Sequence, residues 1–456
     1  MSVSIEMKSK LKSILIALLV SILLSGCLGD GGSNSGNTST DSTLDRLLVR
    51  NGIEPIDDPI VNDAKAALGQ ALFFDKELSG NRNISCATCH TPEATTGDAI
   101  SLSIGEGGVG SAEFREPPFD FHGQPILIPR NSPSLFFRGH LKTLFWDGRV
   151  QQKQDGSFIS PAGEDLLPGL ESSLAVVDMF PFTDRIEMRG QPGQNEIADI
   201  PDDDLQGIWT ALLNRLLAIP GYVVMFTAAY PEIPTVELTF AHAANAIAAF
   251  EIKHWTLNDS PFDHYLHGDQ QAMTEAQKNG AILFYGKAGC VSCHSDSLMT
   301  DESFHNRLVP QLGPGKGHGP NGLYDFGLAA VTGNPEDRYK FRTPPLRSIA
   351  ASGPFMHDGA FATLEAAVLH CMNPMASILA YDFTQLTANY QDSYHPEHTT
   401  EIIAVANEDE IEAVLLTDEE FNLLIEFLQA LSSDSLDDLP ELDTPDSVPS
   451  GLPVED

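Results

Sequence analysis

The amino-acid sequence predicts a mainly α-helical protein that is built from two similar domains. Few segments alternate polar and apolar residues as strands would, the longest apolar patterns have helical spacing, and one cysteine–histidine motif occurs twice. The chain has 456 residues, of which 42% are hydrophobic. This length and this composition suit two domains with apolar cores.

The repeated motif is Cys-x-x-Cys-His, and its two copies use four of the six cysteines. This is the attachment signature of a c-type haem, in which two thiols bind the porphyrin covalently and the histidine supplies a nitrogen to the iron. A zinc site would need further ligands at suitable spacing, and a redox-active cysteine pair rarely carries the histidine. We therefore expect two covalently bound c-type haems, one in each c-type cytochrome-like domain, held by Cys86, Cys89 and His90 and by Cys290, Cys293 and His294.

The helical patterns and the loops between them set the domain boundaries. Residues 91–135 are rich in Gly and Pro and suit a loop that walls a haem. We expect an N-terminal haem domain over 45–258 and a C-terminal haem domain over 259–432. The expected helices cover 64–74, 205–253 with breaks at 220–221 and 231–234, 275–285, 363–370 and 418–431.

The N-terminus has the pattern of an export signal. Three lysines precede an apolar run over 14–24, which is short for a membrane span and typical of a secretory signal. The following Leu24–Cys27 resembles a bacterial lipobox, which implies a signal peptide over 1–26 and a lipidated Cys27. An ordinary signal with an incidental cysteine is the alternative.

The segment after Cys27 is polar and small, so we expect a flexible linker over 27–44. Export agrees with c-type haem, whose attachment takes place on the export side in bacteria. We therefore expect a periplasmic protein with a membrane anchor at Cys27, and the outer membrane is favoured over the inner.

The chain is strongly acidic, with a formal net charge of −38. Nucleic acid is a poor partner for such a protein, because phosphate binding needs clustered Lys and Arg. The acidity suits either a solvated surface or a docking face for a basic redox partner, and we favour the solvated surface. Residues 433–456 are acidic and contain Pro, so we expect a disordered tail there.

Several further segments occur in an order that resembles one known family. They are Leu68–Asp75, Leu78–Asn81, Asn131–Ser134, Phe145–Arg149, Ile186–Met188, Thr343–Arg347 and Pro354–Gly359. In these segments the chain is similar to the bacterial di-haem cytochrome c peroxidases, a family that also contains MauG-type enzymes. The similarity runs from about residue 55 to 432.

The resemblance implies a reaction and two residue roles. Such an enzyme reduces hydrogen peroxide to water at the N-terminal haem, with electrons that enter at the C-terminal haem from a small periplasmic cytochrome c or cupredoxin. Glu187 matches the acid above the peroxide-binding haem, where a carboxylate acts first as base and then as acid. Trp146 matches the tryptophan that relays electrons between the haems.

The resemblance also implies a calcium ion between the domains. Asn131 and the backbone carbonyl groups of Ser352 and Pro354 match the ligand positions, and oxygen atoms are what this hard cation prefers. Family members are often dimers, so the resemblance leaves a homodimer open.

One departure from the family concerns the first haem. Many members carry a histidine that caps this iron until the other haem is reduced, and here Glu106 stands at that position. The first haem is therefore expected to be open to peroxide without reductive activation, as in MauG-type members. His122, in a longer loop, is the alternative cap.

A second departure concerns the other haem. The sixth ligand of its iron falls on Cys371, and a thiolate there would lower the reduction potential of the haem. His370 and Met372 are alternative ligands, and a buried inert cysteine is the remaining interpretation.

Two other functions stay open at this point. One is a MauG-type oxidase, which uses high-valent haems to modify side chains of a protein partner. The other is a tethered di-haem electron carrier without catalytic activity.

Overall fold

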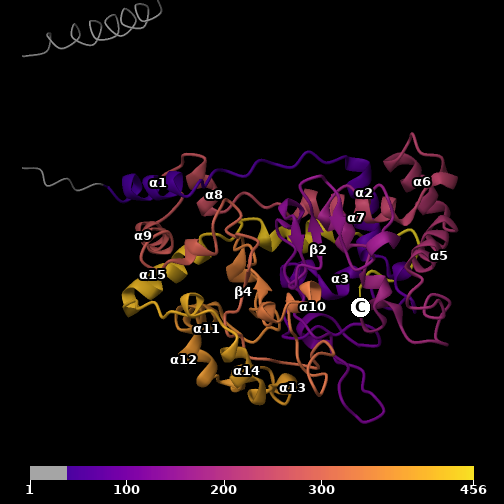
Figure 1. The fold of residues 1–456 in the computed structure, drawn as a ribbon. Coiled ribbons are helices and arrows are strands. Elements are labelled where there is room, and N and C mark those ends of the chain that lie inside the picture. Colours follow the sequence, from indigo (N-terminus) through magenta and orange to yellow (C-terminus); the bar gives the residue numbers. More distant parts are fainter. Residues whose placement is uncertain (1–38, 456) are drawn as a thin grey trace, which may run out of the picture. The chain divides into compact units, whose positions relative to one another are not determined.

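Helices dominate the computed structural model, which describes residues 39–455 (Figure 1). The prediction of a mainly α fold is therefore confirmed. The expected signal peptide and Cys27 lie outside the described residues. The α-helices are α1 (Thr40–Arg50), α2 (Asp63–Phe74), α3 (Cys86–Cys89), α4 (Ser173–Val177), α5 (Leu205–Leu217), α6 (Pro220–Ala229), α7 (Phe240–Trp255), α8 (Pro261–Leu266), α9 (Glu275–Phe284), α10 (Ala329–Thr332), α11 (Leu364–Met372), α12 (Pro374–Leu379), α13 (Ala388–Gln391), α14 (Thr399–Ala404), α15 (Asp418–Gln429) and α16 (Leu439–Asp443).

The expected helix positions agree with these bounds. The patterns over 64–74, 275–285, 363–370 and 418–431 correspond to α2, α9, α11 and α15. The predicted breaks separate α5 from α6 and α6 from α7. Proline explains both breaks. Pro220 is the first residue of α6, and the prolines within 231–234 cannot continue that helix.

Two small antiparallel sheets complete the regular structure. The first has the order β1 (Thr143–Leu144), β2 (Val150–Gln152) and β3 (Phe158–Ile159), and Thr143 lies opposite Gln151. The second pairs β4 (Phe304–His305) with β5 (Phe341–Arg342).

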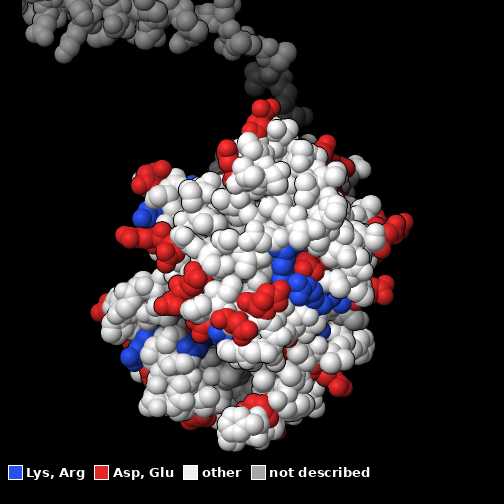
Figure 2. All heavy atoms as spheres, turned by 90° about the vertical axis from the view of Figure 1, so that its right-hand side faces the viewer, with Lys and Arg blue, Asp and Glu red and all other residues white. Residues whose placement is uncertain are grey.

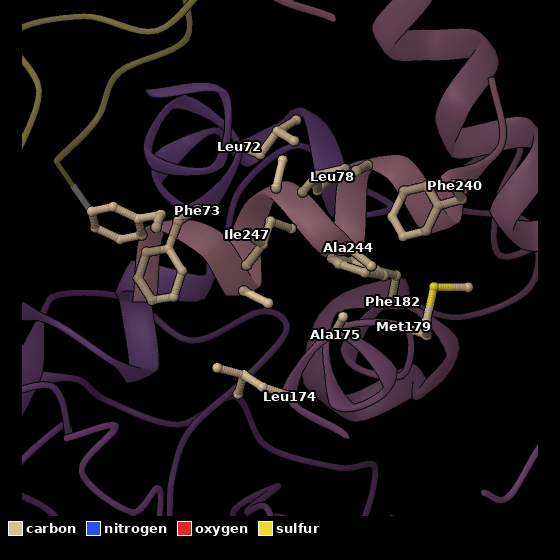
Figure 3. Close-up of a cluster of buried hydrophobic side chains, with 14 of the residues drawn as sticks. Leu72, Phe73, Leu78, Leu174, Ala175, Met179, Phe182, Phe240, Ala244 and Ile247 are labelled. Carbon is tan, nitrogen blue, oxygen red and sulfur yellow. The ribbon is translucent and has the colours of Figure 1, made fainter. Parts of the chain in front are cut away.

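The first apolar core forms around α2 and α7. Figure 3 shows Leu72 and Phe73 of α2 beside Ile247 of α7, with side chains of α4 below them. The two helices meet at Gly69, where a Cβ atom would lie 1.8 Å from the carbonyl oxygen of Ala246. A residue larger than glycine would therefore force the helices apart.

The second core repeats this arrangement with α9 and α15. A Cβ atom on Gly280 would lie 1.9 Å from the carbonyl oxygen of Leu423 and 2.8 Å from Cβ of Phe427. In each half, then, the helix that precedes the haem motif contacts the last long helix backbone to backbone. The packing supports the inference of two similar halves.

The apolar cores do not follow the expected boundaries at the ends of the chain. Residues 40–44 belong to helix α1, and Leu44 and Leu48 of this helix are buried in the second core. The expected linker over 27–44 is therefore wrong for residues 40–44. Ile100, Leu102 and Ile104, from the loop after the first motif, belong to the second core as well. The expected first domain thus contributes residues to the core of the second.

The expected disordered tail over 433–456 is also wrong for its described part. Leu439, the first residue of α16, and Val448 are both buried in the first core. Asp443, which is 1% exposed, accepts hydrogen bonds from Trp255 Nε1 at 2.8 Å and His254 Nδ1 at 2.7 Å. The acidic composition of this segment gave no indication of these buried apolar and hydrogen-bonded residues.

Acidic side chains are spread over the face of the molecule that Figure 2 shows. On the face that Figure 2 shows, red acidic groups are scattered and blue basic groups form smaller clusters. This distribution supports the solvated-surface interpretation of the net charge. No single helix within residues 39–455 is long and apolar enough to span a bilayer, although α5 and α6, bent by 105°, pass that test as a pair.

The contact at Gly280 leads to a stability prediction. Gly280→Ala is expected to lower the free energy of unfolding by about 1–3 kcal/mol, because the added methyl group overlaps the backbone of α15. At an ordinary helix position the same change would stabilise by roughly 0.5–1 kcal/mol. Guanidinium unfolding followed by far-UV circular dichroism measures the difference. Asn279→Ala, on the exposed side of α9, is the control and should not destabilise; equal stability of Gly280→Ala and wild type would contradict the close contact.

Candidate functional site

The first haem motif forms one short helical turn followed by a fixed histidine. Helix α3 holds Cys86 and Cys89, and a capping box between Ser85 and Thr88 starts it. His90 ends the turn, and its Nδ1 lies 2.9 Å from the carbonyl oxygen of Thr96. Since a carbonyl oxygen only accepts, Nδ1 carries the proton and Nε2 has the free lone pair.

The second motif has the same geometry around His294. Its Nδ1 donates to the carbonyl oxygen of Met299 at 2.9 Å. Cys290 begins a tight turn over Cys290–Ser292, and Cys293 directly follows this turn. Desolvation lowers the pKa of both His90 and His294 to about 4, so both rings are neutral at physiological pH. A neutral imidazole whose Nδ1 is bonded to a carbonyl oxygen is the form that binds a metal through Nε2.

The cysteines of both motifs are compatible with attached haem. None of the four is paired in a disulfide. Burial, and to a smaller extent the charge of Cys371, raise the pKa of Cys290 to about 12. The residues present therefore fit two covalently bound haem groups.

Glu187 lies on an unusual turn of the backbone. It belongs to the π-helix Arg185–Arg189, whose first N–H groups are capped by Asp184. Single π-turns are rare and occur frequently at functional sites. The structure therefore holds Glu187 in a specific local conformation.

The electrostatic surroundings of Glu187 favour its protonated form. Burial, and to a smaller extent the charge of Asp184, raise the pKa of Glu187 to about 7, while Arg149 and Lys316 act in the opposite direction. A carboxyl group that titrates near neutral pH can both accept and return a proton.

The loop that carries Glu106 packs directly on the Glu187 turn. The Glu106 N–H group donates to the carbonyl oxygen of Ile186 at 2.9 Å, and a Cβ atom on Gly105 would lie 2.1 Å from the same oxygen. The Glu106 carboxylate accepts hydrogen bonds from the side chains of Asn81 at 2.6 Å and Asn83 at 3.0 Å. Glu106, which stands at the position of the family's capping histidine, therefore lies next to the backbone turn that carries Glu187.

His122 has a different environment. Its ring is exposed and stacks on Phe121, which is 92% exposed, at a centroid distance of 3.7 Å. The loop therefore presents this histidine to solvent, and the structure gives no support to His122 as a cap on the first iron.

Trp146 connects the two halves of the molecule. Its Nε1 donates to the carbonyl oxygen of Asn131 at 3.2 Å, and its own carbonyl oxygen accepts from the Arg342 N–H group at 2.9 Å. Asn131, Ser352 and Pro354 line the same cavity as Trp146. The amide of Asn131 donates through Nδ2 to Ile100, which leaves its oxygen available for a cation.

A buried charge network fixes the segment around Trp146. Arg130 donates to Asp325 at 2.7 and 2.9 Å and to Asp147 at 2.7 Å, and all three side chains are at most 7% exposed. Burial alone would raise the pKa of Asp325, but the Arg130 guanidinium holds it well below its ordinary value. The network joins the first half to residue 325 in the second.

The candidates for the sixth ligand of the second haem differ in their availability. His370 is buried, and its Nδ1 lies 2.9 Å from Ser377 Oγ and its Nε2 2.8 Å from the carbonyl oxygen of Arg307. Protein groups therefore occupy both of its nitrogens. Cys371 and Met372 are half-buried, and the Cys371 thiol is close enough to Cys290 and Cys293 to couple electrostatically with them.

Three contributors to the site were not predicted as site residues. The partner of Arg130, Asp325, lies in a loop with no periodic pattern. Ser132 belongs to the matched segment Asn131–Ser134, and it donates to the carbonyl oxygen of Cys89 at 2.8 Å and lies 3.1 Å from the His90 ring. Lys316 lies on a glycine-rich loop, and its charge acts on Glu187.

Comparisons with known proteins agree with this arrangement. Residues 63–271 match the family model described as di-haem cytochrome c peroxidase. The chain is 31% identical to methylamine utilization protein MauG of Methylorubrum extorquens over 310 residues, which cover 67% of this chain and 68% of that protein. It is 30% identical to cytochrome c551 peroxidase of Pseudomonas aeruginosa over 309 residues, 68% of this chain and 71% of that one.

A solved structure supports the same grouping. A MauG-like protein associated with microbial copper homeostasis aligns with a TM-score of 0.59 and 26% identity, over 86% of this chain and 96% of that chain. The fold and the paired histidine sites are those of a di-haem c-type protein. The chain belongs to the di-haem cytochrome c peroxidase and MauG family, and haem c cofactors follow from that membership.

The Arg130 network leads to a prediction with a defined pH dependence. Arg130→Met leaves the buried Asp325 without its ion-pair partner, while Asp147 keeps its contact with Arg149, and is expected to lower the free energy of unfolding by about 3–5 kcal/mol at pH 7. In the wild type the lowered pKa of Asp325 contributes stability above the ordinary carboxyl pKa, and this contribution is lost as the pH falls through the folded value. In the variant the carboxyl pKa values rise, so the deficit should shrink as the pH is lowered toward 4.

Guanidinium unfolding at pH 7 and pH 4.5 measures both effects. Arg338→Met, whose partner Glu401 is partly exposed, is the matched control and should cost only about 0.2–1 kcal/mol. A deficit of the same size in the two arginine variants would show that burial of the network does not matter.

Proposed function

We propose that this chain is a di-haem cytochrome c peroxidase that reduces hydrogen peroxide to water, with electrons from a small periplasmic cytochrome c or cupredoxin. The observation that carries the proposal is Glu187, held on a π-turn against the Gly105–Glu106 loop with its pKa raised to about 7. The reaction, H₂O₂ + 2 H⁺ + 2 e⁻ → 2 H₂O, needs a group that moves protons at neutral pH.

In this proposal each half of the molecule holds one haem. His90 with Cys86 and Cys89 holds the catalytic group, and the second motif holds the group at which electrons enter. A bound haem supplies the iron at which the peroxide bond breaks and the redox capacity that stores electrons. The hydrogen bonds from Nδ1 to Thr96 and Met299 orient the two histidine rings for this role.

Glu187 is proposed to move the peroxide proton. As a carboxylate it accepts the proton from one peroxide oxygen, and as a carboxylic acid it returns that proton to the departing oxygen. Arg149 and Lys316 favour the carboxylate, while burial and Asp184 favour the acid, so the opposing influences suit a group that changes state. This balance of charges supports the proposed role.

Trp146 is proposed to relay electrons between the two haems. Its hydrogen bonds to Asn131 in the first half and Arg342 in the second support an aromatic bridge across the boundary. The shared cavity of Asn131, Ser352 and Pro354 supports the proposed calcium ion, which would tie the same boundary together.

Cys371 is proposed as the sixth ligand of the second iron. The engagement of both His370 nitrogens, and the closeness of the Cys371 thiol to the two attachment cysteines, support this choice. A thiolate donates electron density to the iron and lowers its reduction potential.

We further propose export to the periplasm and a lipid anchor at Cys27, on the basis of the signal pattern over 1–26. Haem attachment in that compartment agrees with the two motifs. The outer membrane is the favoured destination, and a homodimer stays an open alternative.

A MauG-type oxidase is the second candidate function. The similarity to MauG is as high as that to the peroxidases, and Glu106 replaces the capping histidine. Such an enzyme would oxidise a side chain of a protein partner. A mass shift at a tryptophan or tyrosine of a co-purifying protein, together with slow peroxide turnover with reduced cytochrome c, would favour the oxidase.

The role of Glu187 is tested by Glu187→Gln. The variant should bind two haems but react with peroxide about 10²–10⁴ times more slowly, since the amide cannot accept the proton. Stopped-flow absorbance measures the rate, and Glu237→Gln, a change of an exposed glutamate, is the control.

The wild-type rate should rise with pH through about 7 as Glu187 loses its proton, and the Glu187→Gln variant should lack this rise. An unchanged rate and pH profile in Glu187→Gln would contradict the proposal.

The role of Cys371 is tested by potentiometry. Cys371→Ala should raise the reduction potential of the second haem, because the electron-donating thiolate is lost. Met372→Leu changes the neighbouring side chain and should leave the potential as in the wild type. Equal potentials in Cys371→Ala and the wild type would exclude thiolate ligation.

A further inference from the structure

Three potential metal ligands lie close together on the short segment 395–398, outside both haem motifs. His395, Glu397 and His398 each offer one ligand atom, and these atoms lie within 4.8 Å of one another. Glu397 Oε1 lies 3.1 Å from His395 Nδ1 and 3.8 Å from His398 Nε2. Ligand atoms around a tetrahedral ion, at about 2.0–2.2 Å from the metal, are roughly 3.3–3.6 Å apart. Small side-chain movements therefore produce a coordination geometry.

The ring of His395 is held in an orientation that suits metal binding. Its Nε2 lies 2.9 Å from the carbonyl oxygen of Gly313, so Nε2 carries a proton and donates it. Nδ1 faces the Glu397 carboxylate at 3.1 Å, and a metal ion between the two groups would take the lone pair of Nδ1 in place of a proton. A histidine that ligates a metal through one nitrogen usually donates the other N–H to a carbonyl or carboxylate.

His398 supplies an independent observation. It is 0% exposed, yet neither ring nitrogen has a hydrogen-bond partner within the described part of the chain. Its ring is stacked between Tyr324 at 3.7 Å and His395 at 5.1 Å, so packing fixes its plane. Buried polar atoms are nearly always paired, and a cation would satisfy Nε2.

The three-residue cluster is open to solvent on the side of Glu397. Its side chain is 56% exposed, while that of His395 is 16% exposed. An ion can therefore enter past Glu397, and water can complete the coordination.

We propose that His395, Glu397 and His398 form a binding site for a divalent first-row transition-metal ion, zinc(II) or copper(II). Two imidazoles and one carboxylate match the preferences of these ions, whereas calcium and magnesium prefer oxygen ligands alone. The site is separate from the haem irons and does not depend on the proposed peroxidase activity.

The location of the site suggests what the ion would do. Residues 393–395 are hydrogen-bonded to residues 311–313: Gly313 N–H donates to Ser393 at 2.9 Å and His395 N–H donates to Gln311 at 3.0 Å. The loop that continues from Gly313 carries Lys316, whose charge acts on Glu187. A metal on His395 would therefore stabilise the base of that loop.

The experiment uses the haem-loaded protein, dialysed against EDTA, freed of EDTA and supplied with calcium to fill any oxygen-ligand site. Isothermal titration with zinc chloride, and separately with copper(II) chloride, should show one saturable equivalent. Glu397→Ala, an exposed change that spares the core, should weaken this binding at least about ten-fold, and His398→Ala should abolish it. His264→Ala, an exposed histidine on α8, is the matched control and should bind as the wild type does.

A second readout does not depend on affinity. Electron paramagnetic resonance of the copper(II)-loaded protein should show nitrogen couplings from two imidazoles, and amide hydrogen exchange over 311–324 should slow when the metal is added. Glu397→Ala and His264→Ala should differ in both measurements. The absence of a saturable equivalent in the wild type, or an equivalent that survives in both Glu397→Ala and His398→Ala, would overturn the proposal.

Discussion

In each half of the molecule a glycine allows two helices to meet backbone to backbone. Gly69 brings α2 against α7, and Gly280 brings α9 against α15, with nearly equal distances to the facing carbonyl oxygen and to a phenylalanine one turn further on. In both halves the glycine helix leads into the haem motif. This contact fixes the position of the helix from which the chain continues to the cysteines and the histidine.

The two halves are tied together at a few polar positions. Arg130 reaches Asp325 across the boundary, Trp146 accepts a hydrogen bond from Arg342, and Asn131 N–H donates to the carbonyl oxygen of His357 at 2.8 Å. Asn131 and Trp146 also line one cavity, together with Ser352 and Pro354 of the second half. The proposed electron relay and the proposed cation site thus lie at the contact between the two halves, where they would couple peroxide reduction at one haem to electrons received at the other.

Local patterns predicted the helices and the motifs well. Helices α2, α7, α9 and α15 have strong apolar spacing, and Cys-x-x-Cys-His is specific by residue type. The C-terminal segment was misjudged, because one buried carboxylate, Asp443, and two apolar anchors outweigh an acidic composition. The partners of Arg130 and the ligands around His398 could not be predicted, since they come from loops whose meeting depends on tertiary structure alone.

The proposed reaction requires a first haem that is open to peroxide beside Glu187. Low-temperature electron paramagnetic resonance of the oxidised, haem-loaded protein, before and after addition of hydrogen peroxide, tests this most directly. We predict a high-spin ferric signal from the haem of His90 that is lost rapidly on peroxide addition, next to a low-spin signal from the haem of His294. Two low-spin haems that do not react until one of them is reduced would contradict the account.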